Sequence, residues 1–236
     1  MTSREADCDK SPAHQQTEGR AATVYLALGT NLGDREANLR EAAQRIKALG
    51  LILTRRSSIY ETEPVGFVAQ DWFLNQVIEA QMPCRLMFDR PELDAARLKR
   101  GFDVTAPVDA PSALAEQLVL LLKALLKIED AMGRRRHMVN GPRVIDIDIL
   151  LCGEIKGVFG KPREGGAPDA ESIQRTGEGL PELILPHPRM HLRRFVLAPL
   201  CEIAPSIIHP TLQKTCRELL AALDDPAMIR LYRERA

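Results

Sequence analysis

Residues 141–151 read G-P-R-V-I-D-I-D-I-L-L. Isoleucines alternate with Asp146 and Asp148, and a period of two is typical of a strand whose faces differ. Both carboxylates therefore point to one face, and the isoleucines point to the opposite, buried face. Two like charges are costly to desolvate together unless cations lie between them. The spacing predicts a divalent-metal site, but on its own it leaves open a simpler alternative, the solvated face of an edge strand.

The segment before this strand favours the metal site. Arg134, Arg135, Arg136 and Arg143 lie within ten residues of it in the sequence, and arginine clusters bind phosphate oxygens through forked donors. Mg²⁺ commonly takes one or two carboxylates and completes its shell with water and substrate phosphates. Two such ions form a clamp for attack at phosphorus. Phosphoryl transfer is therefore the leading hypothesis.

Composition limits the other possibilities. The 236 residues contain 32 Lys plus Arg and 32 Asp plus Glu, so no global basic field favours nucleic-acid binding. Aromatic residues make up only 4%, which leaves few stacking platforms for single strands. The five cysteines show no C-x-x-C spacing, which indicates reduced thiols and a cytoplasmic location. No apolar leader and no run long enough to cross a bilayer is present.

Periodicity along the chain predicts a single α+β domain, a ferredoxin-like sandwich with a mainly antiparallel sheet and helices packed on it. Catalytic residues are expected within 23–225, after a disordered tail at 1–22 and before a charged tail at 226–236. Two insertions are expected, at about 83–111, with a short helix at 91–100, and at 157–180, which reads as a mobile loop. The predicted strands are 23–28, 51–60, 72–80 and 144–151, and the predicted helices are 34–49, 112–132, one from about 189, and 213–223.

Three side chains outside the D-x-D strand are candidate ligand contacts. Phe73 and Asn75 share one strand face, where a flat heterocycle could stack on the ring and pair with the amide. His187 stands between two prolines that stiffen its backbone and could donate to a phosphate. From these residues alone, simpler interpretations are favoured, in which Asn75 is an exposed amide and His187 a solvated loop residue.

Six stretches together resemble the 6-hydroxymethyl-7,8-dihydropterin pyrophosphokinase family, over about 24–205 without the two insertions. They are Y-L-A-L-G-T-N-L-G-D (25–34), S-S-I-Y-E-T-E-P-V-G (57–66), F-L-N-Q-V (73–77), the 141–151 strand, L-P-H-P-R-M (185–190) and R-F-V-L-A-P-L-C-E-I-A-P (194–205). The resemblance implies transfer of the β,γ-diphosphate of ATP to the hydroxymethyl group of a reduced pterin, with release of AMP, in folate biosynthesis. It also moves Asn75 and His187 to expected site residues.

The resemblance assigns roles to particular positions. Asp146 and Asp148 would hold two Mg²⁺ ions against the ATP phosphates, and the backbone near Ile149 would meet adenine. Arg134, Arg136 and Arg143 are the expected catalytic and ATP-binding arginines, with His187 and Arg193 as further phosphate contacts. The pterin would lie between Phe73 and Phe195, with Thr62, Val65, Gly66 and Asn75 at its polar edge.

Some positions depart from the family pattern. Asn140 stands where many relatives carry an aromatic residue, Glu63 stands where some carry proline, and the 133–141 loop is a residue shorter than in some relatives. Two other functions remain as alternatives: a two-metal nucleotidyltransferase, which would release pyrophosphate, and a non-catalytic RNA-binding module of the same fold. The expected partners are ATP and a reduced pterin, with no nucleic acid and no membrane; the oligomeric state is left open, with a monomer as one possibility.

Overall fold

A computed structural model of the chain describes residues 21–66, 69–83, 112–135, 141–160 and 182–232. The described strands are β1 (Ala22–Thr30), β2 (Ile52–Arg56), β3 (Tyr60–Thr62), β4 (Phe73–Met82), β5 (Asp146–Cys152), β6 (Gly157–Phe159), β7 (Leu183–Leu185) and β8 (Ile229–Leu231). The described helices are α1 (Arg35–Ala48), α3 (Ser112–Ala131), α4 (Arg194–Ile203), α5 (Cys216–Ala221) and the 3₁₀ turn η1 (Met190–Leu192).

The main sheet has the strand order β5-β1-β4-β3-β8, with β2 also paired to β4. Each of these pairs is antiparallel. The order of elements β1, α1, β2 and β3, β4, α3, β5 is that of a ferredoxin-like unit, so the predicted α+β fold is confirmed. A separate two-stranded sheet joins β6 to β7.

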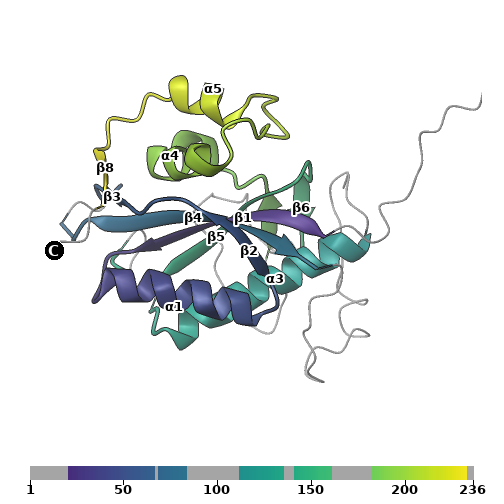
Figure 1. Cartoon of the computed structure of the whole chain (residues 1–236), viewed down its shortest axis with the longest axis horizontal. Coiled ribbons are helices and arrows are strands. Elements are labelled where there is room, and N and C mark those ends of the chain that lie inside the picture. The colour runs from purple at the N-terminus through teal and green to yellow at the C-terminus, as the bar shows by residue number, and fades with distance from the viewer. Residues whose placement is uncertain (1–20, 67–68, 84–111, 136–140, 161–181, 233–236) are drawn as a thin grey trace, which may run out of the picture.

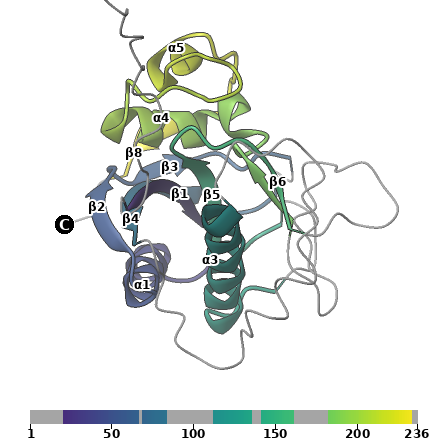
Figure 2. The same ribbon diagram turned by 90° about the vertical axis from the view of Figure 1, so that its right-hand side faces the viewer.

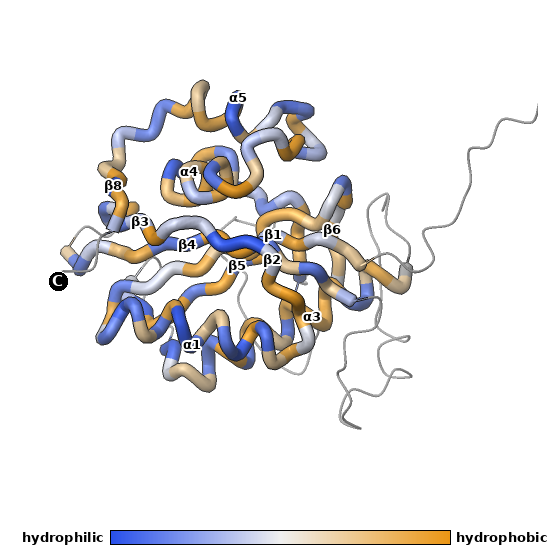
Figure 3. The backbone as a smooth tube through the Cα atoms, in the orientation of Figure 1, coloured by the Kyte–Doolittle hydropathy of each residue, from blue (hydrophilic) through white to orange (hydrophobic). Residues whose placement is uncertain are grey.

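Helices cover both faces of the sheet. Figures 1 and 2 show α1 and α3 on one face and α4 with α5 on the other. The side-chain alternation of β1 divides the core accordingly. Val24, Leu26 and Leu28 pack with α1 and α3, whereas Tyr25 packs with α4. The hydropathy colouring of Figure 3 follows this arrangement, with hydrophobic colour along the central strands.

The same alternation decides which side of β5 is functional. Ile145, Ile147 and Ile149 are at most 3% exposed and belong to the core under α1 and α3. Asp146 and Asp148 therefore face the α4 side of the sheet, as the sequence predicts. This direction places both carboxylates between the sheet and the segment that leads into α4.

The two long helices form where their sequences predict them. The Asp34 carboxylate accepts a hydrogen bond from the Ala37 amide at 3.0 Å and caps α1, and Gly50 ends the turn with φ +93°. In the leucine stripe of α3, Leu118, Leu121 and Leu125 are fully buried. Local capping and helical spacing determine these helices, because neither depends on distant residues.

Several predicted boundaries differ from the observed ones. The predicted 51–60 strand is divided into β2 and β3, because the Ser57 hydroxyl accepts from the Val77 amide and replaces a ladder bond. The helix expected from 189 begins at Arg194, because Arg193 is extended (φ −126°, ψ 110°). The last helix is shorter than 213–223, spanning Cys216–Ala221 after Gln213, whose φ is +53°.

Three short strands, β6, β7 and β8, lie outside the predicted strands. The stretch expected as a loop from 157 begins with β6, whose Phe159 is fully buried. The stretch expected as a charged tail from 226 contains β8, which pairs with β3. All three strands have only three residues, and pairing of such short segments depends on distant partners rather than local pattern. The predicted 91–100 helix, most of the 1–22 tail and the rest of the 157–180 loop lie outside the described residues.

Across the described ranges, no helix is both long and apolar enough to cross a membrane.

A buried carboxylate links β4 to the neighbouring strands and makes stability depend on pH. Burial alone would raise the pKa of Glu79, but hydrogen bonds from Arg55, Thr54 and Tyr25 outweigh it and hold the pKa below 4.5. This contribution to stability is present above pH 4.5 and is lost as the pH falls through the folded-state pKa.

We expect Glu79→Gln to lower the free energy of unfolding at neutral pH by about 1–3 kcal/mol and to flatten its acid dependence. Urea denaturation at several pH values measures both effects. Glu41→Gln is the matched control, since Glu41 is half exposed and its ion-pair partner within the described residues is Arg45 on the same helix. Parallel pH curves for Glu79→Gln and the unchanged protein would contradict the assignment.

Candidate active site

A cavity of about 260 Å³ lies between the sheet and the start of α4. Strands β1, β3, β4 and β5 contribute to one wall, and residues 189–196 form the other. Nine of the residues predicted from the sequence line it: Thr62, Val65, Phe73, Asn75, Arg143, Asp146, Asp148, Arg193 and Phe195. Acidic, basic and aromatic groups from distant parts of the chain therefore meet in one place.

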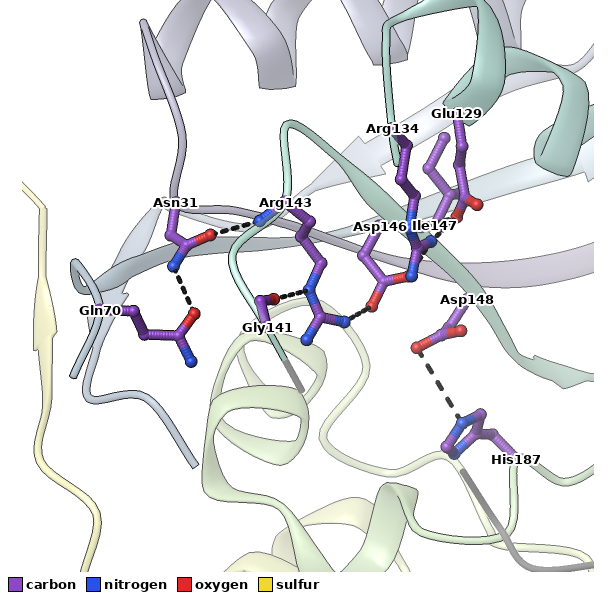
Figure 4. A network of polar contacts seen from close by, with 10 residues as sticks. All are labelled: Asn31, Gln70, Glu129, Arg134, Gly141, Arg143, Asp146, Ile147, Asp148 and His187. Carbon is purple, nitrogen blue, oxygen red and sulfur yellow. Dashed lines mark hydrogen bonds and ion pairs between the residues drawn. The ribbon is translucent and has the colours of Figure 1, made fainter. Parts of the chain in front are cut away.

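Asp146 is held between two arginines (Figure 4). Arg143 donates from Nη1 to Oδ2 at 2.6 Å, and Arg134 donates to Oδ1. The Arg143 guanidinium also donates to the Gly141 carbonyl and lies over the Phe73 ring, 5.3 Å from its centroid. Arg143 thus connects the acidic strand to the aromatic part of the cavity.

Arg134 is more deeply placed than the resemblance implies. Its side chain is 8% exposed and pairs with Glu129 at 2.6 Å as well as with Asp146. Burial opposes its charge, but Asp146 and Glu129 outweigh burial and raise the pKa of Arg134. In this conformation Arg134 is an internal ion-pair partner and does not line the cavity.

Glu129 is a residue that the sequence reasoning missed. It lies on α3, is 1% exposed, and accepts the Ile147 amide at 2.8 Å. The Glu129 carboxylate therefore binds both β5, through the Ile147 amide, and the Arg134 guanidinium. The sequence does contain an indication of this buried ion pair. Glu129 follows Leu125 by four positions on the buried face of an apolar helix, where an unpaired carboxylate would be costly.

Asp148 has fewer protein partners than Asp146. Within the described ranges its polar side-chain contact is with His187, whose Nε2 lies 4.0 Å from Oδ2. The Arg189 amide donates to His187 Nδ1, so in the neutral ring the proton resides on Nε2 and faces Asp148. Burial lowers the pKa of His187 despite the attraction of Asp148, which keeps the imidazole a neutral donor near pH 7.

Arg193 is the cation on the opposite wall. Its guanidinium lies over the Phe195 ring at 5.5 Å, and no carboxylate of the described chain lies within 4.0 Å of it. Burial lowers the pKa of Arg193, with Asp148 opposing that effect. A partly desolvated guanidinium without a close carboxylate favours an anionic ligand.

The aromatic end of the cavity carries a positioned amide. Asn75 is 7% exposed, and its Nδ2 donates to the Thr62 hydroxyl at 2.7 Å. Gly29 faces it across β1 and β4, and a Cβ at that position would lie 3.0 Å from Asn75 Oδ1. Phe73 and Phe195 line the same cavity. Two rings and an oriented amide suit a flat, polar-edged heterocycle.

Asn31 joins the two ends of the site, and sequence reasoning did not identify it. Its Oδ1 accepts the Arg143 amide at 2.8 Å, and its Nδ2 donates to the Gln70 side chain and the Asp71 carbonyl. The side chain is 1% exposed and is shown in Figure 4. Asn31 therefore holds the start of β5 against the segment that precedes Phe73.

Three further predicted site residues, Ile149, Gly66 and Arg136, are absent from the cavity lining or from the described residues. The Ile149 side chain is 3% exposed and lies in the core, so only its backbone remains for a ligand, as the strand alternation requires. Gly66 is exposed and does not line the cavity. Arg136 and Asn140 lie outside the described residues.

The residues present fit magnesium bound together with a phosphate ligand. Asp146 and Asp148 offer hard oxygen donors on one face, and Asp146 already binds two cationic groups. The described ranges contain no cluster of three or more His, Cys, Asp or Glu that could hold a metal ion. A cation here would therefore need water and phosphate oxygens to complete its shell, which is the usual behaviour of Mg²⁺.

Comparisons with known proteins agree on one family. The family model described as 7,8-dihydro-6-hydroxymethylpterin-pyrophosphokinase (HPPK) matches residues 25–94 and 110–205. The chain is 31% identical over 214 residues to the 2-amino-4-hydroxy-6-hydroxymethyldihydropteridine pyrophosphokinase of Bacillus subtilis (strain 168), covering 90% of this chain and 92% of that protein. The protein of the same name from Methylorubrum extorquens is 33% identical, covering 88% and 98%.

Solved structures resemble the chain in fold. Wild-type Plasmodium falciparum HPPK-DHPS superposes with a TM-score of 0.52 at 14% identity, over 87% of this chain. An HPPK-DHPS solved in complex with substrates gives a TM-score of 0.51 at 16% identity, over 86% of this chain. This chain spans 45% and 43% of those two longer chains.

Proposed function

Because the chain belongs to the 7,8-dihydro-6-hydroxymethylpterin-pyrophosphokinase family, we infer that it transfers a pyrophosphoryl group from ATP to 6-hydroxymethyl-7,8-dihydropterin in folate biosynthesis. One observation supports this most strongly: a single cavity brings together the paired carboxylates of β5, the Arg143 and Arg193 guanidinium groups, and the Phe73 and Phe195 rings. Each group matches one part of the reaction, namely the cations, the phosphates and the pterin.

In the proposed arrangement, Asp146 and Asp148 hold two Mg²⁺ ions. Bound there, the ions would neutralise phosphate charge and orient the triphosphate for in-line attack. Arg143 and Arg193 approach from opposite walls of the cavity and would bind phosphate oxygens with forked donors. His187 Nε2 would donate a further hydrogen bond as a neutral imidazole.

The pterin is proposed to occupy the aromatic end. Phe73 and Phe195 would contact its faces, and Asn75 Oδ1, which accepts no hydrogen bond from the described residues, would accept from its ring N–H or amino group. The pterin hydroxyl oxygen would then bond to the β-phosphorus and lose its proton to water, while the bond from that phosphorus to the α–β bridging oxygen breaks and AMP leaves. Positioning and electrostatics supply most of the catalysis in such transfers.

The direct test is incubation of the protein with ATP, Mg²⁺ and the reduced pterin alcohol, followed by chromatography. We expect AMP and the pterin diphosphate in equal amounts, and neither product when the pterin or Mg²⁺ is omitted. Pyrophosphate in place of AMP would indicate nucleotidyl transfer at the α-phosphorus and would contradict the proposal, as would AMP formation that is independent of the pterin.

The Asn75 assignment makes a separate prediction. Gly29→Ala is expected to raise the KM for the pterin about tenfold with little change in the KM for ATP, because its Cβ would displace the Asn75 amide. Steady-state kinetics with each substrate varied measures the effect.

A double-mutant cycle supplies the control. Gly29→Ala acts through Asn75, so Gly29→Ala combined with Asn75→Ala should be no worse than Asn75→Ala alone. Additive losses in the double variant would show that Gly29 acts by another route.

A further inference from the structure

We propose that strand β8 is a clasp for the substrate loop, defined as residues 62–66, and that Glu63 is the positioning residue through which the clasp sets pterin affinity. This inference rests on the proposed pterin site. The substrate loop begins at Thr62, the last residue of β3, and β3 pairs with β8 through Tyr60↔Leu231 and Thr62↔Ile229. The C-terminal strand therefore borders the point at which the loop leaves the sheet.

Glu63 is bound to the segment before β8 at two points. Its amide donates to the Met228 carbonyl at 3.1 Å, and its Oε2 accepts the Met228 amide at 3.0 Å. Glu63 thus forms hydrogen bonds with both backbone polar groups of Met228, through its own amide and through its carboxylate. A proline at position 63 could make neither bond, because it lacks the N–H and the carboxylate. The glutamate therefore extends the β3–β8 pairing by one residue into the loop.

A second set of contacts holds the segment that returns from the loop. Arg230 of β8 donates to Glu61 Oε2 at 2.6 and 3.0 Å, and its guanidinium lies over the Trp72 ring at 4.9 Å. Arg35 donates to the same Glu61 carboxylate and to the Trp72 carbonyl. Glu61 precedes the loop and Trp72 immediately precedes Phe73, so β8 contacts the chain on both sides of the substrate loop.

The clasped loop forms part of the cavity wall. Thr62, Glu63 and Val65 line it, and the Thr62 hydroxyl accepts the hydrogen bond that orients the Asn75 amide. Val65 is 53% exposed, so it has little packing of its own to fix its place. The position of this wall therefore depends on the ends of the loop. A wall ordered before binding lowers the entropic cost of binding.

Loss of the clasp is therefore expected to weaken pterin binding and to leave ATP binding unchanged. The phosphate-binding end is held by contacts that do not involve β8, namely the Glu129 hydrogen bond to the Ile147 amide and the ion pairs of Asp146. Removal of the Glu63 carboxylate should weaken pterin binding about tenfold and leave the KM for ATP and the kcat at saturating pterin within about twofold.

Glu63→Ala and Glu63→Gln form a matched pair for the experiment. The glutamine retains an oxygen that can accept the Met228 amide, whereas the alanine does not. We expect Glu63→Ala to raise the pterin KM about tenfold and Glu63→Gln to restore it to near the original value. An equal loss in both variants would mean that the negative charge acts on the substrate directly and would overturn the positioning role. An unchanged pterin KM in Glu63→Ala would also overturn it.

Amide hydrogen exchange of the full-length protein without ligands provides a readout independent of turnover. Peptides covering 57–66 should exchange faster in Glu63→Ala than in Glu63→Gln, and peptides from α3 should be unchanged in both. Equal exchange of the 57–66 peptides in the two variants would show that no clasp exists, whatever the reaction. If the 57–66 peptides exchange faster in Glu63→Ala but the unchanged protein forms no AMP from ATP and pterin, the clasp exists and the proposed function is wrong.

Discussion

Replacement of Asp148 by alanine is expected to lower kcat by about 100- to 1000-fold while the fold is retained. Asp148 lines the cavity, and its polar contact within the described chain is with His187 at 4.0 Å, so its removal breaks no core contact. Replacement of Asp146 would be harder to interpret, because it would leave Arg143 and the buried Arg134 with fewer anionic partners and could destabilise the fold. The loss should reside in kcat and in the Mg²⁺ dependence of turnover.

Metal binding gives a second measurement for this variant. In the presence of a non-hydrolysable ATP analogue, binding of Mn²⁺ followed by electron paramagnetic resonance should be weaker in Asp148→Ala than in the unchanged protein. Asp224→Ala is the matched control, since Asp224 is exposed and lies beyond α5. Normal turnover and normal Mn²⁺ binding by Asp148→Ala, with an unchanged melting temperature, would refute the metal assignment.

Replacement of Arg143 by alanine is expected to have an effect of similar size, a loss of about 100- to 1000-fold in kcat. The guanidinium pairs with Asp146 and lies over the Phe73 ring, so it lies between the proposed phosphate and pterin positions. The fold should be retained, because the backbone of residue 143 is held independently by Asn31 through both its amide and its carbonyl.

The lysine variant separates charge from geometry at this position. Arg143→Lys retains the positive charge but loses the planar fork, so we expect it to recover only part of the activity. Arg40→Ala, which removes an exposed arginine of α1, should behave as the unchanged protein. A variant with normal kcat and a raised KM for ATP alone would show that Arg143 binds the ground state and the transition state equally.

How much of the site is predictable from sequence depends on the range of the interactions involved. The direction of Asp146 and Asp148 follows from the alternation within one strand, and the structure has both on the cavity side. The same alternation assigns the Ile149 side chain to the core. For Phe73 and Asn75, the strand period predicts a shared face, but not that a second ring, Phe195, stands across the cavity.

The roles of Arg134 and Glu129 could be assigned only from the tertiary structure. A cluster of arginines after a helix indicates an anion site, but only the packing of α3 against β5 shows that Arg134 is buried between Glu129 and Asp146. Likewise, three-residue strands such as β8 carry too little pattern to be recognised alone. Its pairing with β3 is what joins the C-terminal segment to the substrate loop.

The amino-acid sequence by itself determined the helices α1 and α3, the two faces of β5 and the shared face of its two aspartates, because each follows from residues within a few positions of one another. The family resemblance, and no local pattern, implied that Arg193 and Phe195 belong to the same site as the acidic strand. The tertiary structure alone decided that Asn31 binds Arg143 and that Glu63 contacts Met228. These contacts join segments up to 165 residues apart. They arise from the packing of helices on a sheet, and no local sequence pattern predicts them.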